Sequence, residues 1–255
     1  MIRGYAFTGI YYVLSLVFVL ITLPLLILPG RAAVSWSIRQ YCRCVRFAFH
    51  WIGGVKVRIE GKENLPDGAY ILAAKHQSWG DGIIIYPEIR DLTFVTGDHL
   101  AKFPLVGGIL EKLGAIVIDT CGGGDRKVRS LEEGLASAKS EGRRVLIYPE
   151  GHLAPPGKYF RYKAGVWHMQ RETNLPVVPV ASNLGAFWTQ QDIRKRSGTA
   201  TVRILSPLES GLPKDLFLER LTTQIESECA ALLKDTPFAC EATRLISDPK
   251  PRKVD

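Results

Sequence analysis

The sequence predicts an α/β domain with a mainly parallel β-sheet flanked by helices, preceded by an N-terminal membrane-anchoring helical segment. Two observations lead to this prediction. From residue 55 onward, short runs rich in β-branched residues alternate with longer helical patterns, as in parallel sheets with crossover helices. Upstream lies the most apolar stretch of the chain. We therefore divide the chain into a membrane segment (1–54), an α/β domain (55–246) and a disordered tail (247–255).

The composition is that of a globular protein with an unusual distribution of charge. Of the 255 residues, 46% are hydrophobic and 23% charged, which excludes disordered, collagen-like and disulfide-scaffold proteins. Residues 1–59 contain seven of the 33 lysines and arginines and no acidic residue, so the rest of the chain is almost neutral. A nucleic-acid-binding protein usually spreads positive charge over its folded body, so we expect the lipid bilayer, and no nucleic acid, as a partner.

The cysteines and histidines do not have the spacing of a metal site. The five cysteines are an odd number without a C-x-x-C motif, and they predict reduced thiols. No spacing among His99, His152 and His168 resembles a zinc site. We expect neither a disulfide framework nor a bound metal.

The apolar segment near the N-terminus is long enough to cross a bilayer. The 27 residues between Arg3 and Arg31 carry no charge, and about 20 apolar residues suffice for a span. A cleaved signal peptide fits less well, because its apolar region is only about 7 to 15 residues long. Pro24 and Pro29 break the helix near its end, so a single tilted span and a kinked hairpin in one leaflet both stay open.

A second helix is predicted from Trp36 to Val55, with Arg39, Arg43 and Arg46 on one face. Such a helix suits the headgroup interface of a membrane, and the alternative is a soluble amphipathic helix docked on the domain. Because basic residues cluster after the apolar run, the positive-inside tendency places the domain in the cytoplasm, at the inner membrane. Reduced cysteines agree with that location.

The α/β pattern consists of seven predicted strands and five predicted helices. The strands are expected near residues 55–60, 70–75, 92–96, 115–119, 145–149, 177–181 and 199–205. The helices are expected around residues 81–90, 99–113, 125–141, 163–173 and 213–235. In sheets of this type functional residues gather at the carboxyl ends of the strands.

Two of these strand ends have side chains that are candidates for catalysis or ligand binding. One apolar strand ends at His76, and Asp81 follows five residues later as a helix begins. A histidine can accept a proton near neutral pH, and a carboxylate on its other ring nitrogen fixes the tautomer. Another strand delivers Glu150 and Gly151 into a loop, where a carboxylate beside flexible backbone can meet a ligand hydroxyl.

These blocks resemble, in order, those of the bacterial 1-acyl-sn-glycerol-3-phosphate acyltransferases. The resemblance rests on the His-x-x-x-x-Asp element, the Pro-Glu-Gly strand end and the segments 103–107, 175–180 and 183–187. It runs from about residue 55 to 235 and implies the glycerolipid acyltransferase fold. It also implies a lysophospholipid acceptor and, as co-substrate, an acyl thioester such as acyl-CoA or acyl-ACP (acyl carrier protein), with no cofactor.

The resemblance also implies roles for individual residues. His76 would be the general base that deprotonates the acceptor hydroxyl, and Asp81 would orient it. The hydroxyl would then attack the thioester directly, which fits the absence of a G-x-S-x-G motif. Glu150 and Gly151 match the acceptor-binding block, and His152 beside them could donate a hydrogen bond to the acceptor.

Three positions depart from the family pattern at the expected phosphate ligands. Arginine and a threonine–arginine pair are common there, and this chain has Thr120, His152 and Leu153. We expect Arg126 and Lys127, after three glycines, to supply displaced cations for the phosphate. The departures leave two alternatives open: acylation of another lysolipid such as lyso-ornithine lipid, or a non-catalytic relative that only binds lysolipid.

Overall fold

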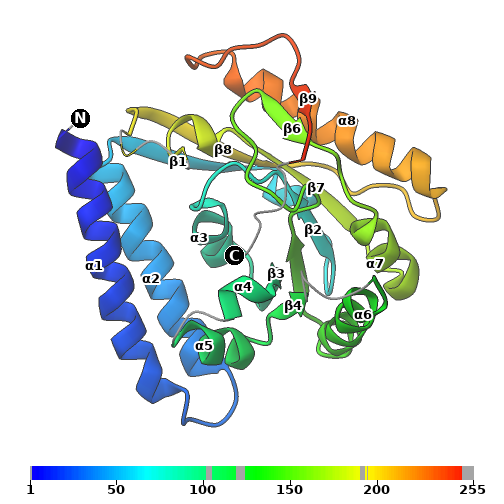
Figure 1. Ribbon diagram of the computed structural model, residues 1–255, viewed down its shortest axis with the longest axis horizontal. Coiled ribbons are helices and arrows are strands. Elements are labelled where there is room, and N and C mark those ends of the chain that lie inside the picture. The colour runs from blue at the N-terminus through cyan, green and yellow to red at the C-terminus, as the bar shows by residue number, and fades with distance from the viewer. Residues whose placement is uncertain (1, 102–104, 119–123, 190–192, 194, 249–255) are drawn as a thin grey trace, which may run out of the picture.

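The computed structural model has a seven-stranded sheet with helices on both faces (Figure 1). It describes residues 2–101, 105–118, 124–189, 193 and 195–248, without the side chains of residues 99, 101 and 124–130. The strand order is β1-β8-β7-β2-β5-β3-β4. The strands are β1 (Val55–Glu60), β2 (Ile71–Ala74), β3 (Leu92–Gly97), β4 (Ile116–Ile118), β5 (Arg144–Ile147), β7 (Val177–Ser182) and β8 (Gly198–Ile204). Every neighbouring pair is parallel except β7 with β8, so the predicted mainly parallel sheet is confirmed.

A second, two-stranded sheet is absent from the sequence prediction. Its strands β6 (Lys158–Phe160) and β9 (Arg244–Ile246) pair in parallel although more than 80 residues separate them. Three residues are too few for an alternating pattern to stand out in the sequence. Strand β9 also ends immediately before the predicted tail, most of which (249–255) falls outside the described residues.

The helices follow the predicted order with two differences. They are α1 (Ile2–Leu25), α2 (Ala32–Trp51), α3 (Asp81–Ile85), α4 (Asp98–Ala101), α5 (Val106–Leu113), α6 (Gly124–Ser140), α7 (Gly165–Thr173) and α8 (Lys214–Leu233). The helix expected over 81–90 ends after five residues and continues as a 3-10 turn that contains Pro87. The helix expected over 99–113 is replaced by α4 and α5, and Leu105 before α5 has a left-handed φ of 70°.

The core has two layers, one on each face of the sheet. Strand β2 shows the division, because its side chains alternate between the faces. Leu72 and Ala74 pack in the layer formed with α1, α2 and α3, whereas Ile71 and Ala73 pack in the layer formed with α6, α7 and α8. All four residues of β2 are buried, as expected for a central parallel strand.

Helices α1 and α2 form an antiparallel hairpin along one side of the domain (Figure 1). Near the open end of the hairpin, the ring of Phe7 lies 5.1 Å from that of Phe49 and 4.9 Å from that of Trp188. Near the turn, the hydroxyls of Thr22 and Ser37 share a hydrogen bond of 2.7 Å. The contacts run along most of α1, so the membrane segment is packed against the α/β domain.

Two of the three arginines on the basic face of α2 contact the α/β domain. Arg39 donates hydrogen bonds to the backbone carbonyls of Pro87 at 2.8 Å and Ile89 at 3.1 Å, and Arg46 forms an ion pair with Glu88. These two arginines therefore help to hold α2 on the domain, whereas Arg43 is exposed. The helix is docked, and contact between its exposed face and lipid headgroups stays a prediction.

Candidate active site

The end of β2 brings together the two residues of the predicted acid–base pair. Asp81 is the first residue of α3, and its carboxylate turns back toward the strand end. The Oδ2 atom accepts hydrogen bonds from Nδ1 of His76 at 3.0 Å and from the backbone N–H groups of Gln77 at 2.7 Å and Ser78 at 2.8 Å. The Asp81 side chain is buried, so these contacts fix the ring of His76 in one orientation.

This geometry also sets the tautomer of His76. Because a carboxylate accepts hydrogen bonds, Nδ1 carries the hydrogen and Nε2 keeps its lone pair. The side chain of His76 is 23% exposed and that of Asp81 only 2%. A bound molecule can therefore reach the histidine and not the carboxylate. The pair can accept a proton at Nε2, and the carboxylate then stabilises the imidazolium.

Tyr148, which follows strand β5, supports the histidine from one side. Its ring stacks on that of His76 with centroids 4.0 Å apart and planes 17° from parallel. Burial raises the pKa of the Tyr148 phenol well above its usual value, so the hydroxyl stays protonated. Among the described residues this hydroxyl has no hydrogen-bond partner, so the ring itself is what contacts the histidine.

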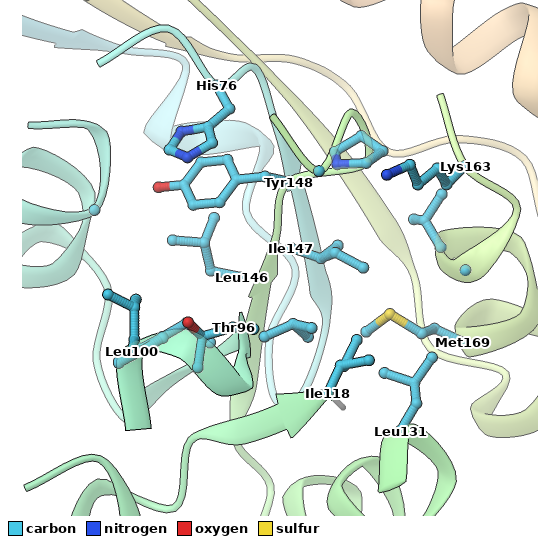
Figure 2. Close-up of a pocket in the computed structure, with 18 of the residues that line it drawn as sticks. His76, Thr96, Leu100, Ile118, Leu131, Leu146, Ile147, Tyr148, Lys163 and Met169 are labelled. Carbon is cyan, nitrogen blue, oxygen red and sulfur yellow. The ribbon is translucent and has the colours of Figure 1, made fainter. Parts of the chain in front are cut away.

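A cavity of about 850 Å³ opens beside His76. Its volume lies within the roughly 300 to 1,000 Å³ of typical ligand pockets. Figure 2 shows His76, Tyr148 and Lys163 at one end and aliphatic side chains at the other. The aliphatic part of the lining includes Ile118, Leu131, Leu146, Ile147 and Met169. The cavity therefore suits a molecule with a polar group near the histidine and a hydrocarbon chain beyond it.

Glu150 lies behind the cavity wall, where a direct contact with a bound acceptor does not occur. Its side chain is fully buried, and both carboxylate oxygens have partners. Oε1 accepts from the backbone N–H of His76 at 3.3 Å, and Oε2 accepts from the backbone N–H of Phe160 at 2.9 Å. Glu150 thus supports the segment that carries His76 from behind the cavity wall.

The same carboxylate belongs to a buried charge network that joins three parts of the chain. Nζ of Lys75 lies 3.0 Å from Oε2 of Glu150 and 2.8 Å from Oε1 of Glu226, and it also donates to the carbonyl of Lys158 at 3.0 Å. The hydroxyl of Tyr162 donates to Glu226 at 2.8 Å. Burial lowers the pKa of Lys75, but the two carboxylates outweigh it and raise that pKa, so the lysine is charged.

The remaining predicted site residues are placed differently. Gly151 lines the cavity, and the ring of His152 packs edge-on against Phe160 at 5.5 Å. Arg126 and Lys127 belong to α6, and their side chains lie outside the described part of the structure. No group of three or more histidine, cysteine or acidic side chains among the described residues could hold a metal ion.

Sequence reasoning missed three side chains of this site: Lys75, Tyr148 and Lys163. Lys75 and Tyr148 stand next to predicted strand-end motifs, and the alternation of each strand could have suggested that they flank His76 and Glu150. Lys163 carries no such signal, because it lies 11 residues beyond the nearest motif residue.

The chain belongs to the acyltransferase family, whose model matches residues 56–183, half of the chain. The matched segment contains the strand ends that carry His76, Asp81 and Glu150.

Three individual proteins are also similar to this chain in sequence or fold. The chain is 29% identical over 178 residues to the 1-acyl-sn-glycerol-3-phosphate acyltransferase of Pseudomonas aeruginosa, covering 70% of this chain and 69% of that protein. It is 27% identical over 146 residues to the lyso-ornithine lipid O-acyltransferase of the same organism, covering 57% and 51%. The crystal structure of the 1-acyl-sn-glycerophosphate acyltransferase PlsC from Thermotoga maritima shares the fold, with a TM-score of 0.74 and 21% identity over 91% of this chain and 96% of that one.

Proposed function

We propose that this protein transfers a fatty acyl group from an acyl thioester to the free hydroxyl of 1-acyl-sn-glycerol-3-phosphate, giving phosphatidic acid for phospholipid synthesis. The observation that carries the proposal is the His76–Asp81 pair at the mouth of the apolar cavity. The relative from P. aeruginosa that is 29% identical is named for this acceptor, which supports the proposal. Acyl-CoA and acyl-ACP both satisfy the chemistry as donors, and the reaction requires no cofactor.

In the proposed reaction His76 acts as a general base and then as a general acid. Its Nε2 atom takes the proton of the acceptor hydroxyl while the oxygen attacks the thioester carbonyl. The C–S bond then breaks, and the departing thiolate takes the proton from the imidazolium. Asp81 keeps the ring oriented and stabilises its charge in between.

The side chains near His76 favour direct transfer over an acyl-enzyme intermediate. Ser78 is fully buried, and its hydroxyl accepts a hydrogen bond from the backbone N–H of Gly80. Cys42 lines the cavity, but burial raises the pKa of its thiol to about 12, so the thiolate is scarce at neutral pH. Neither group is an activated nucleophile, which leaves the acceptor hydroxyl as the attacking group.

The test is acyl transfer by the purified protein with labelled acyl-CoA and 1-acyl-sn-glycerol-3-phosphate. We expect His76→Ala to lower kcat by about 10² to 10⁴, the usual contribution of a general base. Asp81→Asn should be nearly as severe, because it disturbs the tautomer of the histidine. Full activity of both purified variants would refute the assignment of the catalytic pair.

Lyso-ornithine lipid is a second candidate acceptor and is tested in the same assay. Lyso-ornithine lipid has no phosphate, and it fits the replacement of the expected phosphate ligands by Thr120, His152 and Leu153. The resemblance to a lyso-ornithine lipid O-acyltransferase also favours it. Good transfer to this lipid with poor transfer to 1-acyl-sn-glycerol-3-phosphate would replace the leading proposal. Binding of either lysolipid with no thioester consumed would indicate the non-catalytic relative.

Membrane association follows from α1, the one described helix that is long and apolar enough to cross a bilayer. Because α1 packs along α2 through Phe7, Ser15 and Thr22, it cannot leave the domain without losing these contacts. We infer that α1 lies in one leaflet with its outer face in lipid, the hairpin alternative of the sequence. We also infer that the domain faces the cytoplasm at the inner membrane, as the positive-inside tendency predicts.

A further inference from the structure

Lys163 enters the cavity at the end where His76 lies (Figure 2). Its backbone N–H donates to the carbonyl of Pro149 at 2.9 Å, which ties the loop before α7 to the end of β5. Among the described residues that line the cavity, Lys163 is the only lysine or arginine. It forms no ion pair within the described part of the chain, so its charge is available to a bound molecule.

Gly151 provides the surface on which the ammonium group rests. A Cβ atom at this position would lie 3.4 Å from Cε of Lys163, an ordinary contact, and 2.7 Å from its Nζ, closer than such atoms approach one another. Gly151 also has a φ of 69°, a left-handed conformation that favours glycine. The backbone conformation therefore favours glycine at this strand end, and the missing side chain leaves room for the lysine over it.

Other features at this end of the cavity also favour an anion. Helix α7 begins at Gly165, two residues after Lys163, and its first turn has no side-chain cap. Gly165 lines the cavity, and the space above it is open. Uncapped N–H groups at a helix start attract phosphate and carboxylate groups. Burial and then the charge of Lys163 lower the pKa of His152, whereas Asp248 raises it, so Lys163 is close enough to act on this loop electrostatically.

The acidic residues in the lining are set apart from Lys163. Glu172 stands near the opposite end of α7, seven residues after Gly165, or roughly 10 Å along the helix at 1.5 Å per residue. Glu132 belongs to α6 and follows Leu131, which lies at the aliphatic end of the cavity (Figure 2). The positive charge of Lys163 therefore lies at the end of the cavity that holds His76.

From these contacts, and resting on the proposed function, we propose that Lys163 and the start of α7 bind the phosphate monoester of the acceptor and select phosphate-bearing lysolipids over neutral ones. The hydroxyl and the phosphate of the acceptor sit on adjacent glycerol carbons. A cation that binds the phosphate must therefore lie at the same end of the cavity as the base that deprotonates the hydroxyl, and Lys163 and His76 share one end (Figure 2). Lys163 would then supply the charge that the family arginines supply elsewhere.

The experiment compares Lys163→Met with wild type and with Lys158→Met, an exposed lysine outside the cavity. Methionine keeps the length of the side chain, and Lys163 is exposed, so we expect the variant to fold. Steady-state kinetics are measured with 1-acyl-sn-glycerol-3-phosphate and with 1-acylglycerol, which lacks the phosphate. Acceptor binding is measured separately in detergent micelles without the donor, so that the result does not depend on turnover.

We expect Lys163→Met to weaken binding and raise KM for 1-acyl-sn-glycerol-3-phosphate about 10- to 100-fold, as for the loss of a charge-assisted hydrogen bond. The KM for acyl-CoA and the kinetics with 1-acylglycerol should be unchanged, Lys163→Arg should retain most affinity, and Lys158→Met should behave as wild type.

Three results would overturn the proposal. The first is an unchanged affinity for the phosphate-bearing acceptor. The second is a raised KM for acyl-CoA alone, which would assign Lys163 to the phosphates of the coenzyme. The third is an equal fall in kcat with both acceptors, which would assign it to the reacting carbonyl. Failure of the proposed function is seen separately, in the wild-type protein, as absence of transfer to 1-acyl-sn-glycerol-3-phosphate.

Discussion

Replacing Lys75 by methionine tests how strongly the buried charge network holds the active site. The side chains of Lys75 and Glu150 are both fully buried, and that of Glu226 is 7% exposed. In Lys75→Met the ammonium group disappears while both carboxylates stay in place with one partner fewer. The protein must then hold two buried carboxylates whose charges no longer face a cation.

The expected cost follows from these contacts. Removing one partner of a buried ion pair destabilises a protein by about 3 to 5 kcal/mol, and here one lysine serves two carboxylates and a backbone carbonyl. We therefore expect a loss near the upper end of that range, a large part of the roughly 5 to 15 kcal/mol that stabilises a typical domain. The control is Lys75→Met combined with Glu226→Gln, which removes one orphaned charge and should recover about 1 to 2 kcal/mol.

The pH dependence of this loss has a definite sign. Burial raises the pKa of Glu150, and Lys75 opposes that rise, so the variant has a Glu150 pKa that is higher still. A carboxyl whose pKa is raised in the folded state stabilises that state below its unfolded pKa, and the contribution is lost as the pH rises through the folded pKa. The deficit of Lys75→Met should therefore be largest at neutral and alkaline pH. It should shrink as the pH falls toward the unfolded glutamate pKa of about 4.3.

The assay is urea unfolding in detergent micelles, followed by tryptophan fluorescence between pH 5 and pH 8. Because Glu150 also accepts from the backbone N–H of His76, residual activity should fall together with stability. A variant that unfolds within about 1 kcal/mol of wild type at pH 8 would refute the reasoning. A deficit that grows on acidification would refute it as well.

Three further predictions concern packing around the site. Tyr148→Phe should leave kcat close to wild type, because the hydroxyl has no partner among the described residues, whereas Tyr148→Leu should lower kcat by removing the ring under His76. Phe7→Ala should lower the free energy of unfolding by about 3 to 5 kcal/mol, whereas Leu16→Lys on the exposed face of α1 should leave it unchanged and weaken sedimentation with vesicles. Gly80→Ala should lower the free energy of unfolding by about 1 to 3 kcal/mol and lower activity, since a Cβ would lie 2.6 Å from the indole ring of Trp188. A melting temperature and a turnover rate equal to those of wild type would contradict this prediction.

The sequence alone predicted the features that depend on residues close together in the chain. Alternating and helical periodicities located all seven strands of the main sheet and their order along the chain. The His76–Asp81 pair was also predictable, because five residues across a strand-to-helix turn already bring the two side chains within reach. The fold class and the residues of the proposed base therefore follow from short-range pattern.

The side on which each residue lies was decided by the tertiary structure. Glu150 had the expected position at a strand end, but the fold turns its carboxylate away from the cavity and toward Lys75. Arg39 and Arg46 had the expected spacing, but both side chains contact the 3-10 turn at Tyr86–Glu88 in the folded protein. Spacing within a helix fixes which residues share a face, while only packing decides what that face meets.

Contacts between residues far apart in the sequence could not be predicted without the tertiary structure. Lys75 and Glu226 are 151 positions apart, and the ammonium of Lys163 rests on Gly151 only because the loop before α7 is tied to the end of β5. Periodicity and spacing arise within a few turns of one segment, so the sequence determined the elements and the His76–Asp81 pair. The strand order and loop packing bring separate segments together, and they alone decided the cavity, the buried charge network behind its wall and the lysine at the end of the cavity that holds His76.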